Sequence, residues 1–261
     1  MSTIEQLKGI AFRSARLTAG LRGLRTLLHY LRGTPHEREF AFLRDPHFAG
    51  GVFLDLGANI GQSALSANAV QPTLRILSLE PNPACEPGLK MAKRLLGNAF
   101  QYRLVGVGAE LGTLQLYVPV RNSRMLLEEG TLERKGLETE ASRKRNGRPE
   151  VDFSVAVIDV AIVTVDSLDV VPTVVKMDLQ GLELAALQGM RRVLRESAPT
   201  LMVERGRVHA DVVRFLSAIG YDEYYWDGAR LERGEDEGAL NSIFLPPRHA
   251  LRSDNVLRTE S

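Results

Sequence analysis

Three observations predict an α/β fold built on a Rossmann-like, mainly parallel sheet. From Val52 onward, short apolar runs alternate with segments of helical periodicity, a pattern typical of βαβ units. The first run, Val52–Leu56, leads into a tight glycine turn that opens a helix. Two late runs, Tyr221–Trp226 and Asn241–Leu245, flank a glycine-rich, acidic connection and are expected to form an antiparallel pair.

Composition fits a soluble chain of one domain with additions. The 261 residues are 44% hydrophobic and 25% charged, which is ordinary for a globular protein. A net charge of +1 gives no electrostatic reason to expect a nucleic-acid partner. The single cysteine, Cys85, excludes an internal disulfide and a cysteine-based zinc site. No apolar run approaches the roughly 20 residues of a membrane span, and no secretory signal is evident, so we expect a cytoplasmic protein without stable membrane insertion.

Residues 1–50 are predicted to form a helical N-terminal extension over a domain at 51–247, with a tail at 248–261. Gly20 and Gly23 weaken or split the helix expected at 1–34. A layer packed beside the core is the favoured use of its apolar face, and a substrate cover or a homodimer seam is the alternative. That face carries leucines spaced three or four residues apart, at Leu17, Leu21, Leu24, Leu28 and Leu31.

The remaining elements follow in chain order. Thr113–Val118 alternates apolar and polar residues and suits a half-exposed strand. Residues 121–152 are charged and without period, and so long an insertion in a compact domain is typical of either a functional loop or a disordered one. Further strands are expected at 74–79, 101–106, 153–159, 162–165, 174–177 and 200–203, and helices after Gly61 and at 84–96, 182–196 and 209–219.

The glycine turn after the first strand indicates a nucleotide-like ligand. Its sequence, from Asp55 through Gly57, Ala58 and Asn59 to Gly61, places backbone N–H groups and one carboxylate at the carboxyl end of a strand. A dinucleotide fingerprint requires a second glycine where Asn59 stands, because the backbone must approach a pyrophosphate closely. A side chain there is tolerable beside S-adenosylmethionine (SAM), whose ammonium Asp55 could bind through water or backbone.

Glu80 closes the second apolar run and lies nineteen residues after Gly61, a spacing that suits a carboxylate on a ribose diol. The alternative is an acid that favours the next helix dipole. Pro81 follows it directly, and Val107 lies between two glycines at the end of the third strand, where an adenine could rest.

Two acids follow later strands and are predicted to face the same cleft. Asp178 ends the fourth strand and Glu204 the fifth, although each could instead cap the following helix. A carboxylate at Asp178 could orient or deprotonate a hydroxyl nucleophile, with His36 and His209 as reserve acid–base candidates. Glu204 is expected to line the far wall. No motif indicates a tightly held metal, and weakly bound Mg²⁺ stays open.

Taken together, these segments resemble the FkbM family of SAM-dependent O-methyltransferases from about Gly51 to Leu245. The most specific is K-M-D-L-Q-G-L-E at 176–183, where family members tend to read K-I-D-V-E-G-A-E. The chain departs at Gln180, where glutamate is usual, and at Leu182, where a small residue is usual. Other matching segments are F-L-D-L-G-A-N-I-G at 53–61, L-E-P-N-P at 79–83, G-T-L-Q-L-Y-V-P at 112–119, R-N-S-R at 121–124, T-V-D-S-L at 164–168 and N-S-I-F-L-P at 241–246.

The resemblance implies a class I methyltransferase sheet with a reversed last strand, acting on the hydroxyl of a small molecule such as a sugar, glycoside or secondary metabolite. The loop that starts at Arg121, Asn122, Ser123 and Arg124 is expected to cover the acceptor. Two alternatives stay open at this stage. One is an NAD(P)-dependent oxidoreductase, and the other is a SAM-binding module that has lost catalysis, for which Gln180 is the one motif hint.

Overall fold

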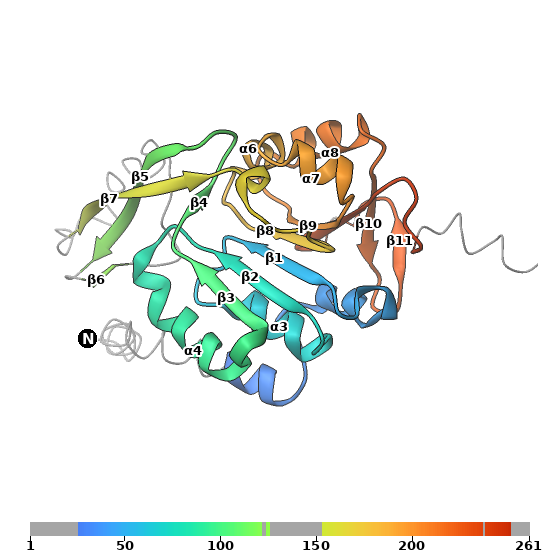
Figure 1. Cartoon of the computed structure of the whole chain (residues 1–261), viewed down its shortest axis with the longest axis horizontal. Helices are drawn as coiled ribbons and strands as arrows, with labels where there is room; N and C mark the ends of the chain where they lie inside the picture. Colours follow the sequence, from blue (N-terminus) through green and yellow to red (C-terminus); the bar gives the residue numbers. More distant parts are fainter. Residues whose placement is uncertain (1–25, 122–123, 126–152, 237, 252–261) are drawn as a thin grey trace, which may run out of the picture.

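A central sheet of eight strands organises the computed structural model, which describes residues 26–121, 124–125, 153–236 and 238–251. The strand order is β11-β10-β12-β9-β8-β1-β2-β3 (Figure 1). The strands are β1 Val52–Leu56, β2 Arg75–Leu79, β3 Phe100–Arg103, β8 Val174–Met177, β9 Thr200–Glu204, β10 Asp222–Trp226, β11 Leu231–Arg233 and β12 Asn241–Leu245.

Strand direction confirms the reversed last strand. Neighbours from β3 through β9 pair in parallel, with β1 between β2 and β8. β12 pairs antiparallel with both β9 and β10, so it runs opposite to the parallel strands β3 to β9. The antiparallel pair expected near the C-terminus is therefore confirmed, and β12 is inserted between β10 and β9.

Helices cover both faces of this sheet, giving three layers (Figure 1). On one face lie α3 (Gln62–Val70) and α4 (Glu86–Leu96), and on the other α6 (Glu183–Gln188), α7 (Arg191–Glu196) and α8 (His209–Ser217). Short 3₁₀ turns link the elements, namely η1 Arg38–Arg44, η2 Pro46–Phe48, η3 Pro83–Cys85, η4 Gly97–Ala99 and η6 Val165–Ser167. Of the helix expected at 1–34, the described part is helical at residues 26–31.

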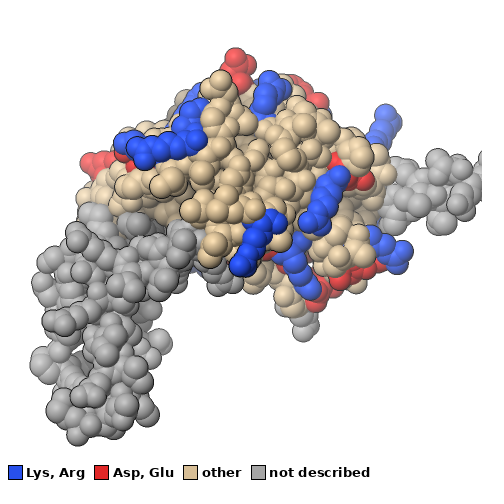
Figure 2. All heavy atoms as spheres, turned by 90° about the horizontal axis from the view of Figure 1, so that it is seen from below, with Lys and Arg blue, Asp and Glu red and all other residues tan. Residues whose placement is uncertain are grey.

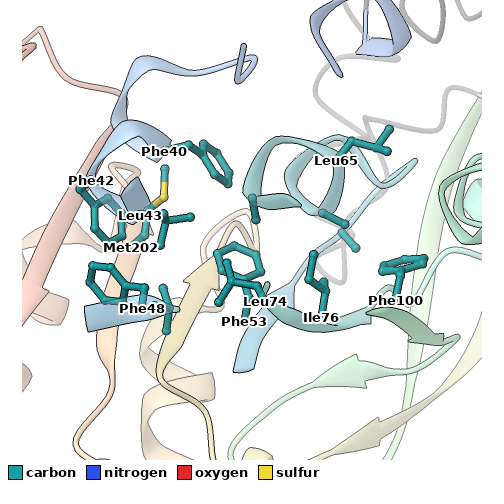
Figure 3. Packing of buried hydrophobic residues seen from close by; sticks show 14 of the residues in the cluster. Phe40, Phe42, Leu43, Phe48, Phe53, Leu65, Leu74, Ile76, Phe100 and Met202 are labelled. Atoms are coloured by element: carbon teal, nitrogen blue, oxygen red, sulfur yellow. The ribbon is translucent and has the colours of Figure 1, made fainter. Parts of the chain in front are cut away.

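Alternation along the strands divides the core into two clusters. Phe53 of β1 packs on the side of α3, whereas Leu54 and Leu56 pack on the side of α6 and α7. Phe40 of η1 and Phe48 of η2 join the first cluster beside Phe53 (Figure 3). The segment before β1 thus lies against the same sheet face as α3, and it brings residues 36–37 to the carboxyl edge of the sheet.

A second, four-stranded sheet of order β4-β7-β5-β6 lies beyond β3 (Figure 1). β5 and β7 pair antiparallel over ten register positions, so the two strands expected at 153–159 and 162–165 are one continuous strand. Gly106–Val107 belongs to this sheet rather than to the end of β3, because it pairs with β7. The bounds are β4 Gly106–Val107, β5 Gly112–Arg121, β6 Arg124–Met125 and β7 Phe153–Val163.

The single helix expected at 182–196 is two helices, α6 and α7, divided at Gly189 and Met190. The break falls at a glycine, which weakens a helix, and a Cβ at Gly189 would lie 2.1 Å from the backbone oxygen of Gly108. β11 was not expected, because its strand character comes from pairing with β10 rather than from an apolar pattern. No helix in the described part of the chain is long and apolar enough to cross a membrane.

Charge is spread over the face seen from below in Figure 1. Figure 2 shows Lys and Arg side chains there as separate groups, with uncharged atoms between them. The described residues on this face form no continuous basic surface of the kind that tracks a phosphate backbone. The expectation that the protein has no nucleic-acid partner stays a prediction.

The close approach of α6–α7 to the second sheet leads to a stability prediction. Gly189→Ala should lower the free energy of unfolding by about 1–3 kcal/mol, because the methyl group must displace the Gly108 backbone. Urea unfolding measures it. Gly112→Ala is the matched control, since a Cβ there meets nothing within 4 Å and its effect should stay within about 0.5 kcal/mol. Equal effects of the two variants would contradict the packing argument.

Candidate active site

The carboxyl ends of β1, β8 and β9 bring three acids to one edge of the sheet. Asp55 is the fourth residue of β1, Asp178 follows β8 directly, and Glu204 ends β9. The register places Asp55 beside Lys176 of β8, and Lys176 beside Met202 of β9. Because side chains alternate along strands, Asp55, Lys176 and Glu204 point to the same sheet face as the segment before β1. Residues far apart in sequence thus share one polar cluster.

The glycine turn is held against both neighbouring strands. The backbone N–H groups of Gly57 and Ala58 donate to Leu79 O of β2, at 2.9 and 3.1 Å. Gly57 has φ 83°, and a Cβ there would lie 1.9 Å from the backbone oxygen of Asp178. Asn59 also has a left-handed backbone, with φ 48°, and Gly61 begins α3 at φ 92°. The tight turn therefore depends on Gly57 and sets the distance between the β1 and β8 ends.

Glu80 joins the glycine turn to the end of β2. Its Oε2 accepts from the Asn59 backbone N–H at 2.7 Å and its Oε1 from the Asn82 backbone N–H at 2.8 Å. Burial raises the pKa of this carboxyl to about 7 against the lowering effect of the two hydrogen bonds. The carboxylate is thereby fixed in one orientation. Pro81 follows it and lies beside Gly106, and Val107 is buried in the apolar cluster around α6.

Asp55 is a fully buried carboxyl with one unsatisfied oxygen. Its Oδ2 accepts from Ser78 Oγ at 2.8 Å, whereas its Oδ1 has no hydrogen-bond partner. Burial raises the pKa of Asp55 to about 6, although the nearby Lys176 ammonium lowers it. A buried acceptor without a donor costs free energy of about 1–3 kcal/mol. This oxygen therefore marks a position where a donor from outside the protein would be stabilising.

Lys176 is the charge on which the acids depend. Only 1% of the residue is exposed, and its Nζ lies 3.4 Å from Asp178 Oδ2. Despite the burial, the acids around it raise the pKa of Lys176, Asp178 most strongly and then Glu37. In return the Lys176 ammonium helps to hold the pKa of Asp178 below its ordinary value against burial. Asp178 is therefore an ionised carboxylate in an otherwise protected site.

Glu204 differs from Asp178 in its protonation state. Burial, together with the hydrogen bond to Asp178 and the charge of that residue, raises the pKa of Glu204 to about 8. Gln180 Nε2 contacts both acids, at 3.0 Å from Asp178 Oδ1 and 3.1 Å from Glu204 Oε2. At neutral pH the pair therefore carries one proton, held by Glu204.

Glu37 is a site residue that sequence reasoning missed. Its Oε2 accepts from Asn241 Nδ2 of β12 at 3.0 Å, and its Oε1 lies 3.3 Å from His36 Nε2. Despite burial, the hydrogen bond with His36, the Lys176 charge and the hydrogen bond from Asn241 hold the pKa of Glu37 below its ordinary value. No periodicity or motif distinguishes a glutamate in an irregular segment, so only the folded chain shows that Glu37 closes one side of the cluster.

The two reserve histidines are both engaged in hydrogen bonds. His36 Nδ1 lies 2.6 Å from Ser66 Oγ of α3, and Nε2 faces Glu37. His209 Nε2 lies 2.9 Å from Glu223 Oε1 of β10, and its buried Nδ1 has no hydrogen-bond partner. His36 is close enough to Asp55 to lower the pKa of that carboxyl, whereas His209 is paired with Glu223 on β10.

The remaining candidates lie at the second sheet. Arg121 ends β5 and faces Arg124 of β6 across an antiparallel pair, so these two positions form a strand end rather than an open loop. Asn122 and Ser123 lie outside the described residues, as does most of the insertion at 121–152. Within the described ranges, no group of three or more His, Cys, Asp or Glu residues is arranged to hold a metal ion.

Strand order, the reversed β12 and the glycine turn between β1 and α3 define a class I, Rossmann-like methyltransferase fold. The chain belongs to the FkbM methyltransferase family, because the sequence model of the family "Methyltransferase FkbM domain" matches residues 55–223, which is more than half of the chain.

A solved structure agrees with this fold. An FkbM methyltransferase from Methylobacillus flagellatus KT is 18% identical with a TM-score of 0.50, over 80% of this chain and 48% of that chain. The likeness shows the fold alone, and this chain spans about half of that protein. A putative O-methyltransferase from Klebsiella pneumoniae is 12% identical, with a TM-score of 0.41, over 86% of this chain and 89% of that chain. The comparison with curated proteins finds no match.

The raised pKa of Asp55 has a measurable consequence for stability. Between about pH 4 and pH 6 the unfolded chain ionises Asp55 while the folded protein keeps it protonated, so wild type loses stability as pH rises. Asp55→Asn lacks this loss. Its free energy of unfolding relative to wild type should therefore increase through that window by on the order of 2–3 kcal/mol and stay level above it.

Urea unfolding of the ligand-free protein at several pH values between 4 and 8 measures this difference. Asp169→Asn, which removes an exposed carboxylate, serves as the control. A constant difference between Asp55→Asn and wild type across the range would show that Asp55 ionises equally in both states.

Proposed function

We propose that this chain is a SAM-dependent O-methyltransferase that methylates a hydroxyl group of a small molecule, such as a sugar, glycoside or secondary metabolite. The observation that carries the proposal is the placement of Asp55, Glu80 and Asp178 at the ends of three neighbouring strands around one glycine turn. Family membership supplies the transferase class. The site supplies the arguments for the cofactor and for the hydroxyl acceptor.

The acids at the ends of β1 and β2 fit SAM. The unsatisfied Asp55 Oδ1 offers an acceptor for an ammonium group, directly or through water. Each Glu80 oxygen accepts one backbone N–H, and since a carboxylate has about four acceptor positions, two are left for a ribose diol. Asn59, with its side chain at the position of the second fingerprint glycine, disfavours a dinucleotide. Gly57, Ala58, Gly61, Pro81 and Val107 complete the proposed cofactor site.

Asp178 is the group we assign to the acceptor. Bound SAM supplies an electrophilic methyl group, and the protein must then hold a hydroxyl oxygen in line and manage its proton. Asp178 is ionised and half-buried, and it lies against the glycine turn. The hydrogen bonds of His36 to Ser66 and Glu37, and of His209 to Glu223, favour Asp178 over either histidine.

Water exclusion is assigned to segments beside this edge. We propose that the N-terminal extension and the insertion at 121–152, beginning at Arg121, Asn122, Ser123 and Arg124, cover the acceptor, while Glu204 lines its far wall. The leucine-rich face near the N-terminus also suits a homodimer seam. Action in the cytoplasm and independence of a tightly bound metal complete the proposal.

The cofactor assignment predicts selective stabilisation by S-adenosylhomocysteine. At about 100-fold over its Kd, the ligand should stabilise the protein by roughly 2.7 kcal/mol, which raises Tm by about 5–10 °C for a chain of this size. Thermal unfolding with S-adenosylhomocysteine, with NAD and with neither measures the shift. A shift with NAD alone would favour the oxidoreductase and overturn our interpretation of Asn59.

The acceptor assignment predicts a separation of binding from turnover. Asp178→Ala should lower methyl transfer by about 10²–10⁴-fold, because the hydroxyl loses its orienting carboxylate, while S-adenosylhomocysteine binds within about threefold of wild type. Calorimetry and a methyl-transfer assay over a panel of sugar and polyketide hydroxyls test it. Asp169→Ala, an exposed acid, is the control. Normal turnover by Asp178→Ala would exclude the assignment.

A further inference from the structure

Gln180 connects two acids that belong to different strands. Its Nε2 donates to Asp178 Oδ1 at 3.0 Å and to Glu204 Oε2 at 3.1 Å, so the two carboxyl groups lie within two hydrogen-bond lengths of each other. Two ionised carboxylates that lie this close repel each other, so the arrangement favours a proton on one of the two.

The surroundings decide which acid holds that proton. Lys176, buried below the pair, forms an ion pair with Asp178 and favours its ionised form. Glu204 has the negative charge of Asp178 beside it, and this charge favours the protonated form of Glu204. Asp55 on β1 and Glu183 on α6 add negative charge around the pair, and Glu37 shares the Lys176 ammonium. A second cation, the Arg207 guanidinium, lies beside Gly181 of the turn. The proton therefore rests on Glu204.

The turn that carries Gln180 is built to present its amide. Gln180 has φ 53°, an unfavourable backbone conformation for a residue with a side chain, and such strain tends to persist where the surroundings enforce it. Glu183 Oε1 accepts from the backbone N–H groups of Leu179 and Gly181, at 2.9 and 3.1 Å, and so fixes the turn from the α6 side. The amide is thereby aimed back across both carboxyl groups.

We propose that Asp178 and Glu204 act as one unit that receives the proton of the acceptor hydroxyl, with Glu204 as the proton carrier and Gln180 as the positioning residue. This inference rests on the proposed function and assigns the proton transfer within the same site. Asp178 contacts the hydroxyl and stays ionised. The proton of the hydroxyl is accepted by Glu204 in those molecules in which Glu204 is deprotonated. Gln180 holds the two acids at hydrogen-bonding distance throughout.

The proposed step balances without a further reactant. As the acceptor oxygen forms its bond to the methyl carbon, the bond from that carbon to sulfur breaks and its electron pair stays on sulfur. The oxygen–hydrogen bond breaks, and the proton moves to the carboxyl pair and then to solvent through half-buried Glu204. Since a base is most effective when its pKa is near the working pH, Glu204 suits this role better than an isolated Asp178.

Proton occupancy of the pair can be measured without any acceptor. In ligand-free protein labelled with ¹³C at Glu and Asp carboxyl carbons, the Glu204 resonance is assigned by its loss in Glu204→Gln. We expect it to titrate with a midpoint near pH 8. Asp178→Asn should lower that midpoint by at least one pH unit, because it removes the neighbouring charge. An ordinary glutamate midpoint in wild type, or no change in Asp178→Asn, would overturn the proposal.

The positioning role is tested by a substitution that keeps shape and removes the donor. Gln180→Met should raise the Glu204 midpoint and lower kcat by about 10²-fold at pH 7.5, with S-adenosylhomocysteine affinity unchanged. Gln101→Met makes the same change at an exposed position on β3 and should leave both quantities at wild-type values. If Gln180→Met leaves the midpoint and kcat unchanged, Gln180 does not position the pair.

The proposed methyltransferase function and the proposed Asp178–Glu204 pair can be refuted separately. A protein that shows no S-adenosylhomocysteine binding and no methyl transfer, yet has the Glu204 titration described above, would refute the proposed function while the carboxyl pair stands. A protein that binds S-adenosylhomocysteine and methylates a hydroxyl, yet titrates Glu204 as an ordinary glutamate, would refute the pair alone.

Discussion

The buried ammonium of Lys176 is the interaction on which the carboxyl edge of this sheet depends. Burying a charged amine without a partner costs several kcal/mol and drives it to lose its proton. Burying a carboxylate without a partner carries a similar cost and drives it to take up a proton. Around Lys176, four acids from β1, β8, β9 and the segment before η1 share one cation. Mutual charge compensation thus requires that these four segments of the chain lie close together.

The same cluster lowers the stability of the ligand-free protein and favours binding of a ligand. Asp55 and Glu80 keep raised pKa values, and Asp55 leaves one oxygen unsatisfied. Both features reduce stability at neutral pH, since the unfolded chain ionises these acids freely. Their persistence in the fold is consistent with a site whose donors come from a bound molecule. Asp178 differs, because Lys176 satisfies its charge within the protein.

Departures from the expected elements have a common origin in contacts that no local pattern records. The helix at 182–196 divides at Gly189, where the Gly108 backbone leaves no room for a Cβ, and β7 runs without interruption because β5 pairs with it from Phe153 to Ile162. β11 forms because β10 offers a partner edge. By contrast β1, β8 and β12 have the expected bounds, since each is a fully or largely buried strand whose apolar run ends at a glycine, a proline or a polar residue.

The sequence by itself determined the α/β class, the glycine turn and the acids that end β1, β2, β8 and β9, because alternation and turn chemistry are local properties written in neighbouring residues. Tertiary structure alone decided that Glu37 approaches Lys176, that Gln180 spans Asp178 and Glu204, and which of these acids keeps a proton. Burial and distance between remote residues fix those properties. Neither exists until the strands are side by side.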